Sequence, residues 1–279
     1  MVKITDCARL PLTQIKGSMK QRFAKSEEYC DKFFQNIIDD FECGDDVHVI
    51  KIKDSFNKVL NKYINIVFEK TNAGETPSAG TISLQGDNRI CGYSLTLPMD
   101  NKNAISLFST TSLMHEVRHI FDYLTNPKIL TRQVGYKKSV PETILFKTVL
   151  TADKDFNKKE LTSWLDHCFG PKDIYNRINF LQSCRHYFLT EKNAYGRELY
   201  YLQKFITEKK HLDFSLLLHP KNEFSQEINR FNDFLNRFNI DGKIEALNEE
   251  LAKAIKTVRD DHKAQLELQA KLLAEGELD

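Results

Sequence analysis

The chain has 279 residues, of which 41% are hydrophobic and 28% are charged. These proportions are those of an ordinary globular protein and exclude global disorder. The 40 basic and 39 acidic residues leave a formal net charge of +1, so nothing in the composition calls for nucleic acid or an anionic membrane as a partner.

The cysteines and the N-terminal residues bear on the compartment. Six cysteines are scattered without a CxxC pair, which is typical of reduced thiols: Cys7, Cys30, Cys43, Cys91, Cys168 and Cys184. Residues 1–7 do not begin the apolar segment of a signal peptide, and no apolar run approaches the length of a membrane span. We therefore predict a cytoplasmic protein, with export into a host or target cell without a cleavable signal peptide as the alternative.

The first hundred residues predict one helix followed by short strands. The helix is amphipathic and spans residues 18–42. The strands are expected at residues 47–52, 63–68, 81–84 and 93–97, with turn residues at 86–88 between the last two. Proline cannot donate a hydrogen bond to a sheet ladder, so Pro98 favours an edge strand at Tyr93–Leu97.

From residue 103 onward the hydrophobic pattern is helical. Helices are expected at residues 103–124, 141–150, 158–168, 173–209 (as one helix or two abutting ones), 223–238 and 244–274. The predicted fold class is α+β, mainly α-helical with a small antiparallel sheet. We divide the chain into a catalytic domain at residues 1–209 and a C-terminal helical extension at residues 210–279 that packs on it.

The helix predicted at residues 103–124 contains the sequence His115-Glu116-Val117-Arg118-His119. The two histidines are four residues apart, so their imidazoles lie on the same helix face and can bind one metal ion. Glu116 follows His115 directly, which places its carboxylate beside the ion rather than on it. In that position it can act as general base toward a zinc-bound water, whose pKa zinc lowers to about 7.

This motif resembles the metal-binding helix of the HExxH zinc metallopeptidases, the zincins. The resemblance implies a zincin-like fold, one Zn²⁺ ion per chain and hydrolysis of peptide bonds. In zincins an edge strand near the metal helix binds an extended protein or peptide substrate, and Tyr93–Leu97 is the strand predicted for this role. The metzincin pattern needs glycine and histidine where this chain has Asp122 and Thr125, so the resemblance is to gluzincins.

A catalytic zinc site needs a third protein ligand, which in gluzincins is a glutamate from a downstream helix. We predict Glu191, because the segment Thr190–Tyr195 resembles the gluzincin ExxA segment and because a carboxylate within an apolar helical stripe is costly unless paired or metal-bound. Glu198 lies two turns further along the same stripe and is a rival ligand or an outer-shell group. Asp122 is a second rival, and we interpret it as an acceptor that orients a ligand imidazole. Tyr195 can donate a hydrogen bond to the oxyanion of the tetrahedral intermediate, or pack as a core tyrosine.

The favoured hypothesis is a zinc endopeptidase of gluzincin type in which His115, His119 and Glu191 bind the ion. Two alternatives stay open: a non-enzymatic protein-interaction module with a degenerate zincin site, and a metal-dependent hydrolase of a non-peptide substrate. The size of the chain and its reduced cysteines also resemble those of toxin-like proteases that bacteria deliver into other cells.

Overall fold

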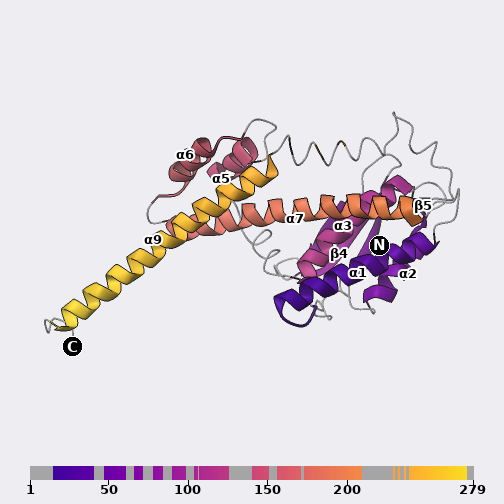
Figure 1. Ribbon diagram of the computed structural model, residues 1–279, viewed down its shortest axis with the longest axis horizontal. Helices are drawn as coiled ribbons and strands as arrows, with labels where there is room; N and C mark the ends of the chain where they lie inside the picture. Colours follow the sequence, from indigo (N-terminus) through magenta and orange to yellow (C-terminus); the bar gives the residue numbers. More distant parts are fainter. Residues whose placement is uncertain are drawn as a thin grey trace. The chain divides into compact units, whose positions relative to one another are not determined.

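The computed structural model describes residues 15–40, 47–60, 66–71, 78–83, 90–98, 104–105, 107–125, 140–150, 156–170, 173–208 and 239–274, with single positions at 229, 232 and 236. Most of these residues are helical, which confirms the prediction of a mainly α-helical protein. The two longest helices, α7 (Ile174–Glu208) and α9 (Ile240–Ala274), have 35 residues each (Figure 1).

The remaining elements are shorter. The helices are α1 (Met19–Asp40), α2 (Val49–Leu60), α3 (Leu107–Thr125), α5 (Val140–Leu145), the π-helix η2 (Phe146–Leu150) and α6 (Lys158–Cys168). The strands are β1 (Val47–His48), β2 (Ile66–Thr71), β3 (Ser78–Ser83), β4 (Ile90–Pro98) and β5 (Ala104–Ile105). The bounds of α6 and α7 agree with the predicted helices to within a residue, and α7 is one continuous helix.

Three strands form a sheet in the order β2–β4–β3. The sheet is mixed, because β4 runs antiparallel to β3 but parallel to β2, so the predicted purely antiparallel sheet is wrong. The predicted edge strand at Tyr93–Leu97 is also wrong, since these residues lie in the central strand and are paired on both sides. Pro98 takes the last position of the ladder, opposite Thr71, where the strand ends.

The predicted strand at residues 47–52 is wrong beyond its first two residues. Val47 and His48 pair with β5, and α2 begins at Val49. The helix places Ile52, Phe56 and Val59 on one face, all buried, which is the i, i+4, i+7 pattern of a helix packed on a core. The turn predicted at residues 86–88 and all but three positions of the helix predicted at 223–238 lie outside the described residues.

The chain divides into two compact units. The first unit contains residues 1–131 and 190–232, and the second contains residues 132–189 and 233–279. This division does not coincide with the predicted boundary at residue 209, because α7 continues from one unit into the other. The C-terminal helix α9 packs against α6 within the second unit.

The core of the first unit surrounds α3. Its largest wholly buried apolar side chains come from α1, α2, α3, β4 and the last part of α7: Phe33, Phe34, Ile37, Ile38, Ile52, Leu95, Leu97, Phe121 and Tyr201. Helix α3 packs against α1, β3 and β4. Apolar residues such as Met114, Val117 and Ile120 are buried on several sides of α3. Polar residues of this helix, among them His115, Arg118 and His119, are buried as well.

The second unit has its own core, formed by α5, η2, α6, the first part of α7 and α9. Glu250 of α9 is fully buried there, and its carboxylate accepts hydrogen bonds from Arg177 at 2.8 Å and Thr162 at 3.1 Å. Burial alone would raise the pKa of Glu250, but its hydrogen bonds outweigh that effect and lower it. The buried carboxylate therefore stays ionised and links α6, α7 and α9.

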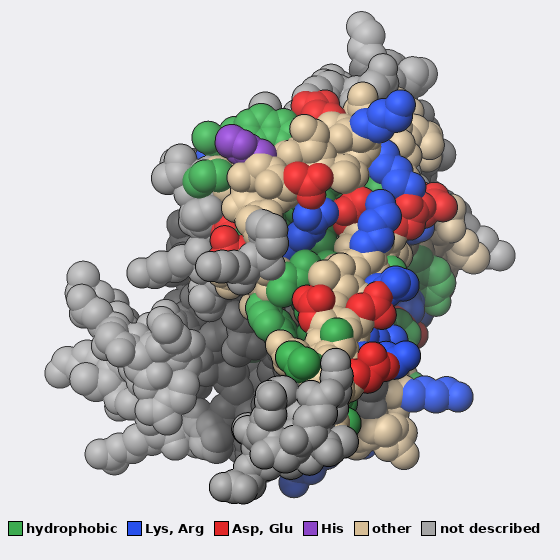
Figure 2. All heavy atoms as spheres, turned by 90° about the vertical axis from the view of Figure 1, so that its left-hand side faces the viewer, with side chains coloured by type: hydrophobic (Ala, Val, Ile, Leu, Met, Phe, Trp, Pro, Cys, Tyr) green, Lys and Arg blue, Asp and Glu red, His purple; other side chains and the backbone are tan. Residues whose placement is uncertain are grey.

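The surface carries mixed charge. On the face drawn in Figure 2, the described acidic and basic side chains are interspersed rather than gathered by sign. This arrangement accords with the net charge of +1. None of the described helices combines the length and the apolar character that crossing a membrane requires.

Tyr201 attaches α7 to α1 in the first unit. Its ring is buried against Phe34, and its hydroxyl donates a hydrogen bond of 2.8 Å to Asp31. We expect Tyr201→Phe to lower the free energy of unfolding by about 1 kcal/mol, the typical net value of one hydrogen bond. Tyr201→Ala, which also leaves a cavity, should cost about 3–5 kcal/mol. Denaturant unfolding followed by circular dichroism measures both, and wild-type stability of Tyr201→Phe would contradict the assigned hydrogen bond.

Candidate metal centre

Helices α3 and α7 meet in the first unit along a row of polar side chains, which we call the polar seam. It consists of Ser112, His115, His119 and Asp122 on α3, and Glu191, Asn193 and Glu198 on α7. The α3 members are spaced by three, four and three residues, so they share one helix face. Ser112 pairs with Glu198 and Asp122 pairs with Asn193, so the two helices pair in opposite chain directions.

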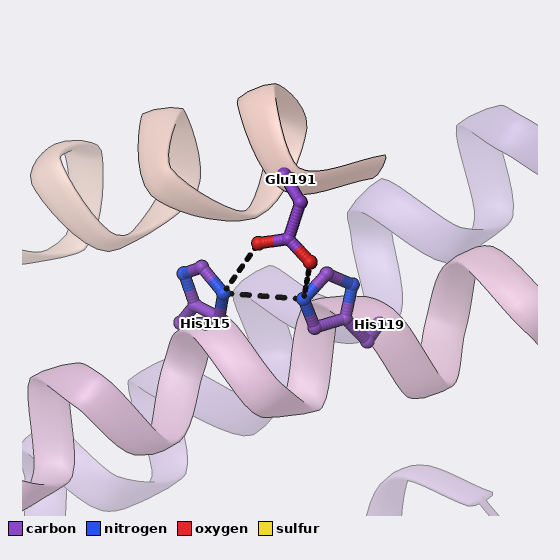
Figure 3. Close-up of side chains that lie close together, drawn as sticks. All are labelled: His115, His119 and Glu191. Atoms are coloured by element: carbon purple, nitrogen blue, oxygen red, sulfur yellow. Dashed lines mark hydrogen bonds and ion pairs between the residues drawn. The ribbon is translucent and has the colours of Figure 1, made fainter. Parts of the chain in front are cut away.

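The two histidines of the motif and the predicted third ligand come together in this seam. Figure 3 shows both imidazoles projecting from α3 toward the carboxylate of Glu191, which reaches them from α7. The Nε2 atoms of His115 and His119 are 3.1 Å apart. Glu191 places Oε2 3.5 Å from Nε2 of His115, and Oε1 3.6 Å from Nε2 of His119.

These distances fit three ligands of one divalent ion. Two atoms that each lie about 2.1 Å from a zinc ion, with a tetrahedral angle between them, are about 3.4 Å from each other. The two nitrogens are 3.1 Å apart, and each lies 3.5 or 3.6 Å from a different oxygen of Glu191, whereas one ligand atom from each of the three residues gives separations within 4.8 Å. Two imidazole nitrogens and one carboxylate form a donor set that suits zinc, whereas magnesium and calcium prefer oxygen ligands alone. The described residues therefore include a group of three side chains that could hold one metal ion.

Glu198 holds a different position from the one a third ligand needs. Its Oε2 lies 3.4 Å from Nδ1 of His115, and its Oε1 accepts a hydrogen bond of 3.3 Å from Ser112. Nδ1 and Nε2 are on different sides of the imidazole ring, so Glu198 cannot share an ion with Nε2 in this arrangement. Its negative charge, 3.4 Å away, favours a proton on Nδ1 through an ion pair rather than a hydrogen bond.

The interpretation of Asp122 as the acceptor that orients a ligand imidazole is wrong. Its Oδ1 accepts hydrogen bonds from Nε and Nη2 of Arg118, at 2.9 and 2.5 Å, and the amide of Asn193 lies 3.2 and 3.3 Å from its two oxygens. These contacts occupy the carboxylate, so it is neither a ligand nor an imidazole partner. Position i+3 placed Asp122 on the correct face, but Arg118, also on α3, competes for it.

Arg118 is the largest wholly buried side chain of the described residues. Besides Asp122, its guanidinium pairs through Nη1 with Glu27 of α1, and Glu27 also pairs with Arg197 of α7. Arg118 therefore belongs to an ion-pair network in the core of the first unit. A buried guanidinium needs such partners, because removing one charge of a buried pair leaves the other unsatisfied.

The two imidazoles titrate in opposite directions. Burial favours the neutral form of His115, but hydrogen bonds with Glu191 and Glu198, together with the charges of Glu198 and Glu116, raise its pKa to about 9. At His119 burial dominates and lowers the pKa to about 4. Burial alone would raise the pKa of Glu191, but the two histidines outweigh it and lower the pKa. A divalent cation would therefore displace a proton from His115 at neutral pH.

Aromatic rings flank both histidines. The ring of Tyr195 meets that of His115 edge-on, with centroids 4.4 Å apart. The ring of Tyr123 lies nearly parallel to that of His119, with centroids 6.4 Å apart, and Tyr93 of β4 stacks on Tyr123 at 6.3 Å. Among the described residues Nδ1 of neither histidine has a hydrogen-bond partner, so ring packing contributes to the orientation of both imidazoles, and an ion pair of 3.4 Å joins Nδ1 of His115 to Glu198.

Glu116 lies half-buried on α3 between the two histidines in sequence. Its negative charge contributes to the raised pKa of His115 and to that of Tyr123, which burial raises to about 12. A carboxylate that acts on both groups is close to the site. Its role as general base stays a prediction.

Three residues of this region were missed from the sequence. Ser112 precedes His115 by three residues and so shares its helix face, a signal that was sufficient to predict it. Asn193 and Glu27 gave no such signal. Asn193 lies outside the apolar stripe of α7. Glu27 is distant in sequence from both α3 and α7.

Comparisons of the chain with models of known protein families, with curated proteins and with solved structures give no match. The function of the polar seam is therefore argued from its own residues and geometry.

Removal of Asp122 should lower the stability of the first unit, because the buried guanidinium of Arg118 then loses a charged partner. We expect Asp122→Ala to destabilise the first unit by about 3–5 kcal/mol, because Arg118 then keeps only Glu27. The double variant Arg118→Met/Asp122→Ala should be more stable than Asp122→Ala alone. Hydrogen exchange of the α3 amides measures the stability of this unit, and a double variant less stable than the single one would contradict the assignment.

Proposed function

We propose that this protein is a zinc-dependent endopeptidase of gluzincin type with a zincin-like catalytic unit. One observation carries the proposal: Nε2 of His115, Nε2 of His119 and the carboxylate of Glu191 form a triangle in which one ligand atom from each residue lies within 4.8 Å of the other two. The side chain of Glu191 is 19% exposed to solvent, whereas that of Glu198 is 6% exposed. Solvent and substrate would approach from the more open side of Glu191.

The residues around the triangle supply the remaining parts of a hydrolytic site. A bound zinc ion supplies Lewis-acid chemistry, because it acidifies water and polarises a carbonyl group. The carboxylate of Glu116 accepts the proton of the attacking water and passes it to the nitrogen of the leaving amine. Glu198 holds Nδ1 of His115, so that the opposite nitrogen stays directed at the ion.

Tyr195 is the proposed hydrogen-bond donor to the oxyanion. Its ring lies against His115 and is half-buried, so the side chain borders the triangle without being closed off in the core. A phenol is a suitable donor because its hydrogen bond to a developing negative charge strengthens in the transition state.

Peptides are the proposed substrate, and the sheet offers a way to bind them. Helix α3 packs against β3, and among the described strands β3 lies at an edge of the sheet. An extended peptide can add to such an edge through backbone hydrogen bonds. We therefore propose that Ser78–Ser83, rather than Tyr93–Leu97, binds the extended peptide substrate.

The proposed compartment is the cytoplasm. Cys30, Cys168 and Cys184 are free thiols, and Cys30 and Cys184 are buried. Burial, together with the neighbouring carboxylates, outweighs Arg118 and raises the pKa of the Cys30 thiol, so this cysteine is unreactive and packs as a small apolar residue.

The ligand assignment predicts a graded loss of zinc. We expect His115→Ala, His119→Ala and Glu191→Ala to abolish stoichiometric zinc binding, because each removes a direct ligand. Glu198→Gln should weaken binding by only about 10–100-fold, the usual effect of an outer-shell partner. His262→Ala, at an exposed position of α9, is the matched control and should bind one equivalent. Full zinc content in Glu191→Ala would remove Glu191 from the site.

The catalytic assignment predicts that Glu116→Gln separates metal binding from turnover. The variant should bind zinc as the wild type does, yet lose at least about 10²-fold in rate, because it lacks a general base. Incubation of a proteome-derived peptide library, followed by mapping of new N-termini, compares it with the wild type. No cleavage by the zinc-loaded wild type would favour the interaction module or a non-peptide substrate, and equal cleavage by Glu116→Gln would exclude Glu116 as the base.

A further inference from the structure

We propose that Asn193 is a positioning residue, whose amide fixes α7 against α3 so that Glu191 reaches both imidazoles. The amide lies 3.2 and 3.3 Å from the two oxygens of Asp122. A carboxylate only accepts hydrogen bonds here, so the donor is the NH₂ group of the amide. The inference rests on the proposed metal site and adds a residue that does not touch the ion.

The placement of Asn193 makes it suited to this role. It follows Glu191 by two residues, so the two side chains leave α7 about 200° apart around the helix axis. Glu191 therefore projects toward His115 and His119, while Asn193 contacts α3 beyond His119, at Asp122. Contacts on two sides of α7 fix its rotation about its own axis, which a single contact cannot do.

The acceptor of this contact is itself held rigidly. Arg118 binds Asp122 through two nitrogens and binds Glu27 of α1 through a third. All three groups lie within the first unit, and Arg118 has no exposed surface. Contacts therefore run from Glu27 through Arg118 and Asp122 to Asn193. They connect α7 to the core of the first unit.

Such a device is needed because the third ligand is remote in sequence. Between His119 and Glu191 lie 71 residues, so the backbone near the motif does not set the position of Glu191. Metal ligands tolerate deviations of only about 0.2 Å from their preferred distances. The side chains of α7 that contact this face of α3 besides Glu191 include Glu198, with Ser112 and His115, Tyr195, with His115, and Asn193, with Asp122. Of these three, Asn193 is nearest in sequence to the ligand.

The test compares metal binding by the full chain carrying Asn193→Ala, Asn193→Leu or Asn176→Ala. Asn193→Leu keeps the volume of the side chain and removes the donor. Asn176→Ala makes the same change as Asn193→Ala at an exposed position of the same helix. Zn²⁺ affinity is measured by competition with a chromophoric chelator, and coordination geometry is read from the absorption spectrum of bound Co²⁺.

We expect both Asn193 variants to bind Zn²⁺ about 10-fold more weakly than the wild type, at the lower end of outer-shell effects, and to show an altered Co²⁺ spectrum. Asn176→Ala should match the wild type in both measurements. A wild-type affinity and spectrum in Asn193→Leu would overturn the positioning role and leave the metal site standing. Absence of zinc binding by the wild type would instead overturn the proposed function, and this inference with it.

Discussion

The first unit depends on one physical constraint, the cost of placing charged groups in a protein interior. The polar seam and its surroundings bury the carboxylates of Glu27, Asp122, Glu191 and Glu198 around the side chains of Arg118, His115 and His119. An unpaired charge there would cost several kcal/mol, so every carboxylate has a cationic or hydrogen-bonding partner. Two sets of partners result. Arg118 satisfies Asp122 and Glu27, and the histidines satisfy Glu191 and Glu198. The contacts of Arg118 connect α1 and α3, whereas the histidines and their two glutamates form the candidate metal centre.

The two histidines are held by different means, and the difference follows from their positions on α3. His115 faces Glu198 through Nδ1, in an ion pair of 3.4 Å. His119 lies one turn nearer the sheet residue Tyr93 and is oriented by Tyr123, whose ring stacks between them. Glu191 and Glu198 together raise the pKa of His115, whereas at His119 burial outweighs the effect of Glu191 and lowers the pKa. One imidazole therefore contributes a proton to the site and the other a free lone pair at neutral pH.

The errors of sequence interpretation share a physical origin. Residues 47–52 are β-branched and short, yet from Val49 onward they are helical, because the helix buries Ile52, Phe56 and Val59 against the core. Pro98 suggested an edge strand, but it only ends a central one. Asp122 shares a face with the histidines, but Arg118 takes up its carboxylate. In each case the local pattern allowed two structures, and contacts with other side chains or strands chose between them.

The sequence by itself determined the features that depend on helical spacing. These include the long helices, the common face of His115 and His119, the place of Glu116 beside them, and the apolar stripe that singled out Glu191. Only the tertiary structure decided which carboxylate meets Nε2 and which meets Nδ1, and that α1 anchors Arg118 through Glu27. The reason is that helix periodicity relates residues up to about two turns apart, whereas 71 residues separate α3's histidines from Glu191 and only packing brings them together.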